Sequence, residues 1–228
     1  MAAVDVYTFP LRTSPERLEF LQEILSPAER ERISRFRFSL NRRQAIICRG
    51  TLRETLSRYL DLDPADVCFA YNRRGKPYIA DSEVRFNVSH SGNWAMIAVS
   101  NEAEVGIDLE RIEPHVAQER TPERFFSPSE IARLRALPDS QQTQAFFRCW
   151  TRKEAYIKAR GLGMAVPLDS FAVSFGPDEP AAFLSGADGW SIQDLDAPHG
   201  YAAAVVAEGS ELTVFRCSVA EATELLPA

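Results

Sequence analysis

The sequence lacks any apolar run near the ~20 residues that a transmembrane helix needs. Its first ten residues, MAAVDVYTFP, have neither a basic start nor a long apolar stretch, so we expect no signal peptide. Cysteine is scarce, and none of the four has a partner at the spacing of a metal site: Cys48, Cys68, Cys149 and Cys217. We therefore predict a cytoplasmic protein with reduced cysteines in its core and no membrane partner.

The chain also lacks positive net charge and three familiar catalytic motifs. It has 26 basic and 32 acidic residues, a net charge of −6, which argues against a nucleic-acid partner. There is no Walker phosphate loop, no HExxH and no GxSxG, which speaks against NTPases, zincins and α/β-hydrolases. With 45% hydrophobic and 25% charged residues over 228 positions, the composition is that of a soluble globular protein.

One segment, residues 27–60, departs from the acidic whole. Three glutamates there are outnumbered by nine arginines: Arg30, Arg32, Arg35, Arg37, Arg42, Arg43, Arg49, Arg53 and Arg58. Such a segment is either a solvated helical face or a local site for an anion, for example a phosphate or an acidic protein.

The chain repeats itself at a shift of 101 residues. The tetrapeptide that begins at Ser26 returns at Ser127, and both copies have Ser, Pro and Glu at the positions that begin a helix. At the same shift Cys48 falls on Cys149, and Arg53 falls on Glu154. We predict two similar halves, residues 1–104 and 105–228.

Each half has the same expected layout of helices followed by strands. A long helix is predicted over residues 40–60 and again over 140–160. Strands are predicted over residues 67–71, 84–89, 94–100, 105–110, 170–175, 190–195, 201–207 and 212–218. This is an α+β fold of two pseudo-twofold-related halves, each with helices on a mainly antiparallel sheet, and with the active site in the cleft between them. Because one chain supplies both halves, we expect a monomer.

Acidic side chains lie where two of the predicted elements would bury them. Asp108 and Glu110 alternate along one strand and share a face, which is either a solvated face or a pair of ligands. In the helix over 140–160, Glu154 falls inside an apolar arc with Trp150, while Arg152 lies opposite. A buried carboxylate requires a charged partner or a metal. The structural alternative is a pair with Lys158, worth ~0.3–0.5 kcal/mol.

Polar turns complete the candidate set. The turn that includes Gly75 can present Lys76 to an anion, and Ser89, His90 and Ser91 offer donors where a strand ends. Each is equally compatible with a structural role. Arg53 lies within an apolar arc, so it forms either a structural salt bridge to the other half or a contact with a ligand phosphate. Three carboxylates with lysines and arginines favour phosphate chemistry with Mg²⁺, which Mn²⁺ could replace.

Three motifs of the sequence resemble those of the Sfp-type 4′-phosphopantetheinyl transferases. They are Gly75-Lys76-Pro77 with Phe86-Asn87-Val88-Ser89-His90-Ser91, then Val105-Gly106-Ile107-Asp108-Leu109-Glu110, and finally Trp150-Thr151-Arg152-Lys153-Glu154-Ala155-Tyr156-Ile157-Lys158. The order and spacing are those of the family, and the likeness extends from about Ser26 to Val173. The resemblance implies transfer of the phosphopantetheine arm of coenzyme A to a serine of an apo acyl or peptidyl carrier protein, with release of adenosine 3′,5′-bisphosphate.

The resemblance also assigns roles by motif position. Asp108, Glu110 and Glu154 would hold Mg²⁺ on the pyrophosphate. Glu154, or a metal-held water near Glu110, would take the serine proton, and Lys158 would stabilise the leaving phosphate.

Coenzyme A itself would be bound by residues from several motifs: Arg32, Lys76, Ser89, His90, Asp108 and Lys158. Lys153 is fixed in the motif, and its expected role is a structural pair with a carboxylate. Two rival functions remain at this point, a non-catalytic module that captures carrier domains or nucleotides, and a Mg²⁺-dependent phosphoesterase with no protein acceptor.

Overall fold

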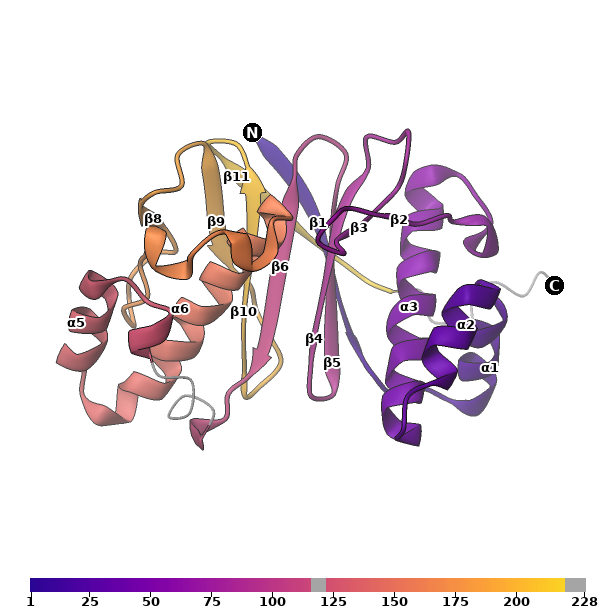
Figure 1. Ribbon diagram of the computed structural model, residues 1–228, viewed down its shortest axis with the longest axis horizontal. Helices are drawn as coiled ribbons and strands as arrows, with labels where there is room; N and C mark the ends of the chain where they lie inside the picture. The colour runs from indigo at the N-terminus through magenta and orange to yellow at the C-terminus, as the bar shows by residue number, and fades with distance from the viewer. Residues whose placement is uncertain (116–121, 220–228) are drawn as a thin grey trace.

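Two β-sheets stand face to face in the middle of the computed structural model, and helices cover their outer faces (Figure 1). The structure describes residues 1–115 and 122–219. The first sheet has the strand order β11(Leu212–Cys217), β1(Ala2–Pro10), β5(Trp94–Ser100), β4(Arg85–Ser91). The second has the order β6(Val105–Arg111), β10(Tyr201–Glu208), β9(Trp190–Asp194). Every neighbouring pair is antiparallel except β1 with β11, which confirms the predicted α+β class.

The helices form the two outer layers. The first sheet is covered by α1(Pro15–Glu23), α2(Pro27–Ser34) and α3(Ser39–Leu60), and the second by α5(Pro128–Ala136) and α6(Asp139–Arg160). Short 3₁₀ turns follow at Pro64–Asp66, Pro122–Arg124, Gly163–Ala165 and Leu168–Ser170, and two small ribbons pair β2(Ala70–Tyr71) with β3(Pro77–Tyr78) and β7(Ala172–Val173) with β8(Phe183–Ser185). Among the described residues no helix is long and apolar enough to cross a bilayer.

Alternating apolar residues account for the layers. Val6, Met96, Ile107 and Val205 belong to the cluster buried between the two sheets. The opposite faces pack on the helices, so each strand in the middle of a sheet is buried on both sides. This arrangement leaves β4 and β6 as neighbouring edges of two different sheets, with α6 beside them.

Most of the predicted elements are present at nearly the predicted bounds. The two long helices and the strands at 94–100, 190–194 and 201–208 agree within about a residue. The strand predicted over 67–71 is shorter, since β2 covers only two residues, and that predicted over 170–175 is reduced to β7. Four segments without a predicted helix or strand form β1, α1, β3 and β8. The C-terminal strand β11 lies in the first sheet, beside β1.

The repeated tetrapeptides form the same helix start in both halves. Ser26 caps α2 and Ser127 caps α5, each in a capping box with a glutamate three residues on, Glu29 and Glu130. Each glutamate is buried and binds a cation from the following long helix. Arg53 Nε donates to Glu29 at 2.8 Å, and the ammonium of Lys153 lies 2.7 Å from Glu130.

These pairs correct one expectation about the repeat. Arg53 takes the place of Lys153, rather than that of Glu154, because α6 begins 11 residues after the start of α5 whereas α3 begins 12 residues after the start of α2. Both cations also bind carbonyl groups of the segment after the long helix, Pro64 for Arg53 and Leu168 for Lys153. Arg53 and Lys153 are therefore structural, and the pair predicted for Lys153 is confirmed.

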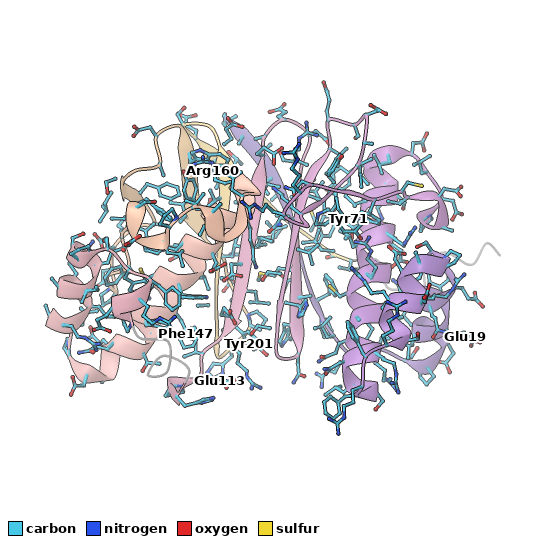
Figure 2. The ribbon with its side chains drawn as sticks, in the orientation of Figure 1. Glu19, Tyr71, Glu113, Phe147, Arg160 and Tyr201 are labelled. Carbon is cyan, nitrogen blue, oxygen red and sulfur yellow. The ribbon has the colours of Figure 1, made fainter. Side chains whose placement is uncertain are left out.

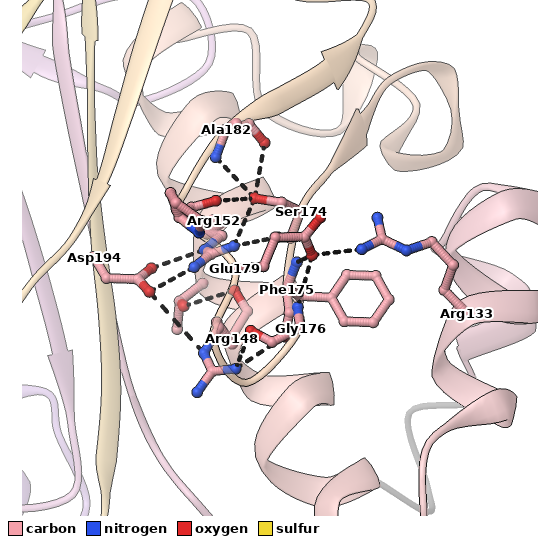
Figure 3. Close-up of polar contacts among 11 residues, drawn as sticks. Arg133, Arg148, Arg152, Ser174, Phe175, Gly176, Glu179, Ala182 and Asp194 are labelled. Carbon is pink, nitrogen blue, oxygen red and sulfur yellow. Dashed lines mark hydrogen bonds and ion pairs between the residues drawn. The ribbon is translucent and has the colours of Figure 1, made fainter.

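The face of α6 opposite its apolar arc is also buried. Arg152 is fully buried, and its guanidinium donates two hydrogen bonds, of 2.8 and 2.5 Å, to the carboxylate of Asp194 in β9 (Figure 3). A third bond, of 2.9 Å, reaches the hydroxyl of Ser174. Arg148 donates to the carbonyl groups of Phe175 and Gly176. A helix buried on nearly all sides gives fixed positions to the polar side chains that it carries.

The cysteines differ partly from expectation. All four are free thiols, and Cys149 is buried, with its pKa raised by that burial. Burial likewise raises the pKa of the Cys48 thiol to about 11. Cys68 is exposed, which corrects the expectation of a core position, because only its neighbour Val67 turns inward.

Candidate active site

The edges of the two sheets are joined by side chains of β4. Within these two described strands there is no shared ladder, since β4 and β6 belong to separate sheets. Instead, side-chain oxygens of alternate β4 residues accept hydrogen bonds from alternate main-chain N–H groups of β6. The pairs are Asn87 with Ile107 at 2.9 Å, Ser89 with Leu109 at 3.1 Å, and Ser91 with Arg111 at 3.1 Å. We call this set of three rungs the β4–β6 seam. It satisfies an edge that would otherwise expose main-chain donors.

Asp108 lies beside the middle rung of the seam. Its Oδ1 accepts the hydroxyl proton of Ser89 at 3.0 Å and a hydrogen bond from the Lys158 ammonium at 2.5 Å. Lys158 also donates to the Ser89 oxygen at 2.9 Å, which closes a triangle of three residues. The other carboxylate oxygen, Oδ2, is buried, and among the described residues it is the only such side-chain atom without a hydrogen-bond partner.

A glycine brings α6 to this place. A Cβ atom on Gly106 would lie 2.1 Å from the carbonyl oxygen of Ala155 and 2.3 Å from the nitrogen of Ala159, so only glycine allows the helix to touch β6. Glu154 and Lys158 flank this contact on α6 and therefore lie on the side of β6 that carries Asp108. The helix ends, as expected, at Gly161 with φ of 61°.

Glu110 takes the next position of β6 on the same face as Asp108. Its Oε2 accepts a hydrogen bond of 2.9 Å from the Ser91 hydroxyl, and the side chain is half-buried. Glu154 is half-buried as well, next to the buried Trp150 region of α6. The alternation of Asp108 and Glu110 therefore places both carboxylates toward α6, away from open solvent.

The fit of these carboxylates to a metal ion is partial. Among the described residues no three His, Cys, Asp or Glu side chains form a group that could hold an ion as they stand. The Oδ2 atom of Asp108, however, is suited to be a metal ligand. A buried acceptor without a donor is costly, and a bound cation would remove that cost. Oxygen ligands of this kind suit Mg²⁺ and Mn²⁺. The three-carboxylate set stays a prediction, with Asp108 as its best-supported member.

Lys76 connects the turn between β2 and β3 to β6 and α6 at the upper end of the seam. Its ammonium donates to the carbonyl oxygens of Ala159 at 2.9 Å and Val105 at 3.2 Å, and lies 3.1 Å from Glu104. Burial lowers its pKa, and the nearby Glu104 partly offsets this shift. Asn72 of the same turn donates to the carbonyl of Gly161 at 2.9 Å. The turn is therefore fastened to the end of α6, and its lysine does not lie free.

His90 follows Ser89 on β4 and is exposed. Burial of part of the imidazole and the positive charge of Lys158 lower its pKa, so the ring is neutral at pH 7. Tyr201 lies at the far end of the seam (Figure 2). Its hydroxyl accepts a hydrogen bond of 3.1 Å from the N–H of Asn93 in the β4–β5 hairpin. Gln44 at the start of α3 donates to the carbonyl of Gly92 in that hairpin.

The arginine-rich segment divides into structural and exposed members. Arg49 and Arg53 bind Glu29, so they form structural salt bridges, but within residues 1–104 and not to the other half as expected. Arg30 donates to the carbonyl of Glu23 at the end of α1. Arg32, the predicted coenzyme A ligand, is exposed on α2. The structure does not bring it into contact with the triangle around Asp108.

Sequence reasoning missed the side chains that hold the acidic residues in place. Ser91 was expected only as a donor at the end of the strand, with no link to Glu110, and neither Asn87 nor Gly106 was singled out. A signal exists in retrospect: Asn87, Ser89 and Ser91 alternate with Val88 and His90, which predicts one polar strand edge.

Comparison with known families agrees with these features. Residues 104–206 match the family model described as the 4′-phosphopantetheinyl transferase superfamily, and residues 12–102 match the model of a 4′-phosphopantetheinyl transferase N-terminal region. The 4′-phosphopantetheinyl transferase HetI of a Nostoc species is 41% identical over 210 residues, which is 90% of this chain and 88% of the relative. The 4′-phosphopantetheinyl transferase Sfp of Bacillus subtilis is 35% identical over 166 residues, 72% of this chain and 73% of the relative.

A solved structure is similar to part of the chain. The holo-(acyl-carrier-protein) synthase of Bacillus anthracis, in complex with coenzyme A, is 20% identical with a TM-score of 0.41, over 47% of this chain and 96% of that one. The family assignment rests on the sequence relatives, which cover 90% and 72% of this chain. This chain belongs to the 4′-phosphopantetheinyl transferase superfamily and is an enzyme of that family.

Proposed function

We propose that the protein transfers the 4′-phosphopantetheine group of coenzyme A to a serine of an apo acyl or peptidyl carrier protein, in a Mg²⁺-dependent reaction. The serine oxygen forms a bond to the phosphorus that carries pantetheine. The bond from that phosphorus to the bridging oxygen breaks, and the electron pair leaves with adenosine 3′,5′-bisphosphate. The serine proton must be accepted, and the negative charge on the leaving oxygen must be neutralised.

One observation carries this proposal: Asp108 has a buried oxygen without a partner next to the ammonium of Lys158. An anionic pyrophosphate needs positive charge around it. A carboxylate is negative as well, so it can lie next to the pyrophosphate only if a cation binds between the two. Asp108, Glu110 and Glu154 are the residues that would hold a divalent cation. Bound there, Mg²⁺ or Mn²⁺ would spread the negative charge of the pyrophosphate.

Two residues of α6 have catalytic roles, one as the base and one in stabilising the leaving group. Glu154 is the base that takes the proton of the carrier serine, since its half-buried carboxylate lies on the same side of β6 as Asp108. Lys158 stabilises the charge that develops on the leaving phosphate. Its side chain is 29% exposed and, within residues 1–115 and 122–219, donates hydrogen bonds to Asp108 and Ser89, so it can turn toward a phosphate by giving up those bonds.

Coenzyme A would lie along the exposed end of β4. His90 is accessible there and lies within the field of Lys158, while Arg32 on α2 is an exposed cation. Lys76 would contribute by holding its turn against α6. Ser89 would contribute through its hold on Asp108 and Lys158, because its oxygen already makes three hydrogen bonds. One chain supplies both strands of the seam, which supports a monomer, and we propose a cytoplasmic location.

The test is a transfer reaction with coenzyme A, Mg²⁺ and several apo carrier proteins. Intact mass of the carrier and the amount of adenosine 3′,5′-bisphosphate are measured with and without EDTA. The proposal predicts a gain of one phosphopantetheine per carrier, an equal amount of the bisphosphate, and loss of both with EDTA. Metal-dependent breakdown of coenzyme A without carrier modification would indicate a phosphoesterase instead. Neither change, with every carrier tried, would contradict transfer.

A further inference from the structure

The hydroxyl of Ser91 is held in one orientation by two neighbouring groups of β6. Its oxygen accepts the main-chain N–H of Arg111 at 3.1 Å, and its proton goes to Glu110 Oε2 at 2.9 Å. A serine hydroxyl has one donor, so the rung of the seam on one side and the carboxylate on the other define its orientation. The same atom therefore joins the two sheets and holds an acidic side chain.

Ser89 forms the same unit two residues earlier. Each serine accepts the N–H of the β6 residue 20 positions on and donates to the carboxylate 19 positions on, Asp108 for Ser89 and Glu110 for Ser91. The third rung lacks this second contact. Asn87 accepts the N–H of Ile107, but position 106 is glycine and has no side chain to hold. The carboxylate contact is thus separable from the joining of the sheets.

We propose that Ser91 is a positioning residue that holds Glu110 in the orientation in which it binds a divalent cation. A glutamate on an edge strand has three rotatable bonds, and fixing them in advance favours ion binding. Ser91 is half-buried and next to the exposed Arg111, so loss of its hydroxyl leaves an N–H that water can reach. Removal of the hydroxyl should therefore lower the affinity for the ion and have little effect on the stability of the fold. The inference rests on the proposed function, since it assigns Glu110 to the ion.

The test compares Ser91→Ala, Ser91→Thr and Asn87→Ala in the full chain. Free Mn²⁺ is measured by electron paramagnetic resonance during titration of each protein in the presence of coenzyme A. We expect Ser91→Ala to weaken Mn²⁺ binding by about tenfold. Ser91→Thr keeps a hydroxyl and should bind as the wild type does. Asn87→Ala removes a rung without a carboxylate, so it should lower the melting temperature and leave Mn²⁺ affinity unchanged; Asn87→Ser serves if that variant does not fold.

Each outcome separates this inference from the proposed function. Unchanged Mn²⁺ affinity in Ser91→Ala would overturn the inference, as would equal weakening in a folded Asn87 variant, which would mean a purely structural effect. A wild-type protein that binds no Mn²⁺ in the presence of coenzyme A would overturn it as well. A protein that shows the expected Mn²⁺ series but modifies no carrier would support the inference and reject the transferase. In the transfer reaction, excess Mg²⁺ should restore most of the rate of Ser91→Ala.

Discussion

Lys158 binds one oxygen of the Asp108 carboxylate, at 2.5 Å, and leaves the other oxygen buried and unpartnered. Other buried ion pairs of the protein are more completely satisfied. The two carboxylate oxygens of buried Glu29 bind Arg49 and Arg53, and Glu130 binds Lys153 and the N–H groups of Val173 and Ser127. Asp108 differs from these carboxylates because one of its oxygens has no hydrogen-bond partner among the described residues. This difference indicates a site that a bound ion or ligand completes.

The contact between α6 and β6 predicts the effect of Gly106→Ala. The new Cβ would overlap the backbone of Ala155 and Ala159, and a backbone cannot turn aside as a flexible side chain can. We expect a loss of about 1–3 kcal/mol in the free energy of unfolding and a large loss of transfer, because Lys158 moves with the helix. Gly189→Ala is the control: it has φ of 81° with open space around it, so it should cost about 1 kcal/mol and keep activity. Equal activity of both variants would contradict this account.

Lys153 predicts a stability effect. Its ammonium is fully buried and binds Glu130 together with the carbonyl oxygens of Leu168 and Phe171. Lys153→Met should lower the free energy of unfolding by about 3–5 kcal/mol, since it leaves the Glu130 charge buried and unpaired. Urea denaturation measures this. The exposed pair of Arg135 with Glu123 is the matched control, and Arg135→Met should change stability by no more than about 1 kcal/mol.

His90 predicts a pH dependence. Burial and the charge of Lys158 lower its pKa from 6.5, so the unfolded chain takes up a proton more readily than the folded one. The stability contribution is therefore fully present above 6.5 and is lost as pH falls from there through the lower folded value. His90→Gln should flatten the melting temperature between neutral pH and about pH 5. Lys158→Met should raise the pKa of His90, as followed by NMR of the imidazole; an unchanged or lower value would show that Lys158 does not act on the ring.

Lys76 predicts a joint effect on stability and substrate binding. Because its ammonium serves the carbonyl groups of Val105 and Ala159, Lys76→Met should lower the free energy of unfolding by about 1–3 kcal/mol. It should also raise the KM for coenzyme A, since the turn loses its hold on α6. Arg74→Met in the same exposed turn should leave stability unchanged. A raised KM with full stability would instead indicate direct contact of Lys76 with coenzyme A.

Local patterns explain what the sequence alone predicts. The helix starts at Ser26 and Ser127 and the alternation of Asp108 with Glu110 depend on neighbours within a few residues, and all appear in the structure. Pairings between distant segments do not follow from such patterns. Ser91 and Glu110 are 19 residues apart and meet only because β4 and β6 are the facing edges of two sheets.

The burial of cations was equally hidden in the sequence. A helical projection places Arg152 opposite the apolar arc of its helix, as if toward solvent. In the fold, the segment from Ser174 to Asp194 covers that side and supplies the acceptors that the guanidinium needs. The alignment of the two repeats was also hidden in the sequence. The contacts of Arg53 with Glu29 and of Lys153 with Glu130 show that the second repeat has one residue fewer before this position.

The most direct test of the account is carrier modification by the Asp108→Asn variant. The asparagine oxygen can still accept from Ser89 and Lys158, while an amide nitrogen that cannot bind a cation replaces Oδ2. Intact mass of an apo carrier protein would be followed over time with coenzyme A and Mg²⁺, alongside the melting temperature. The account predicts a rate lower by about 100-fold or more with a melting temperature near that of the wild type. Carrier modification at the wild-type rate by the folded variant would contradict it.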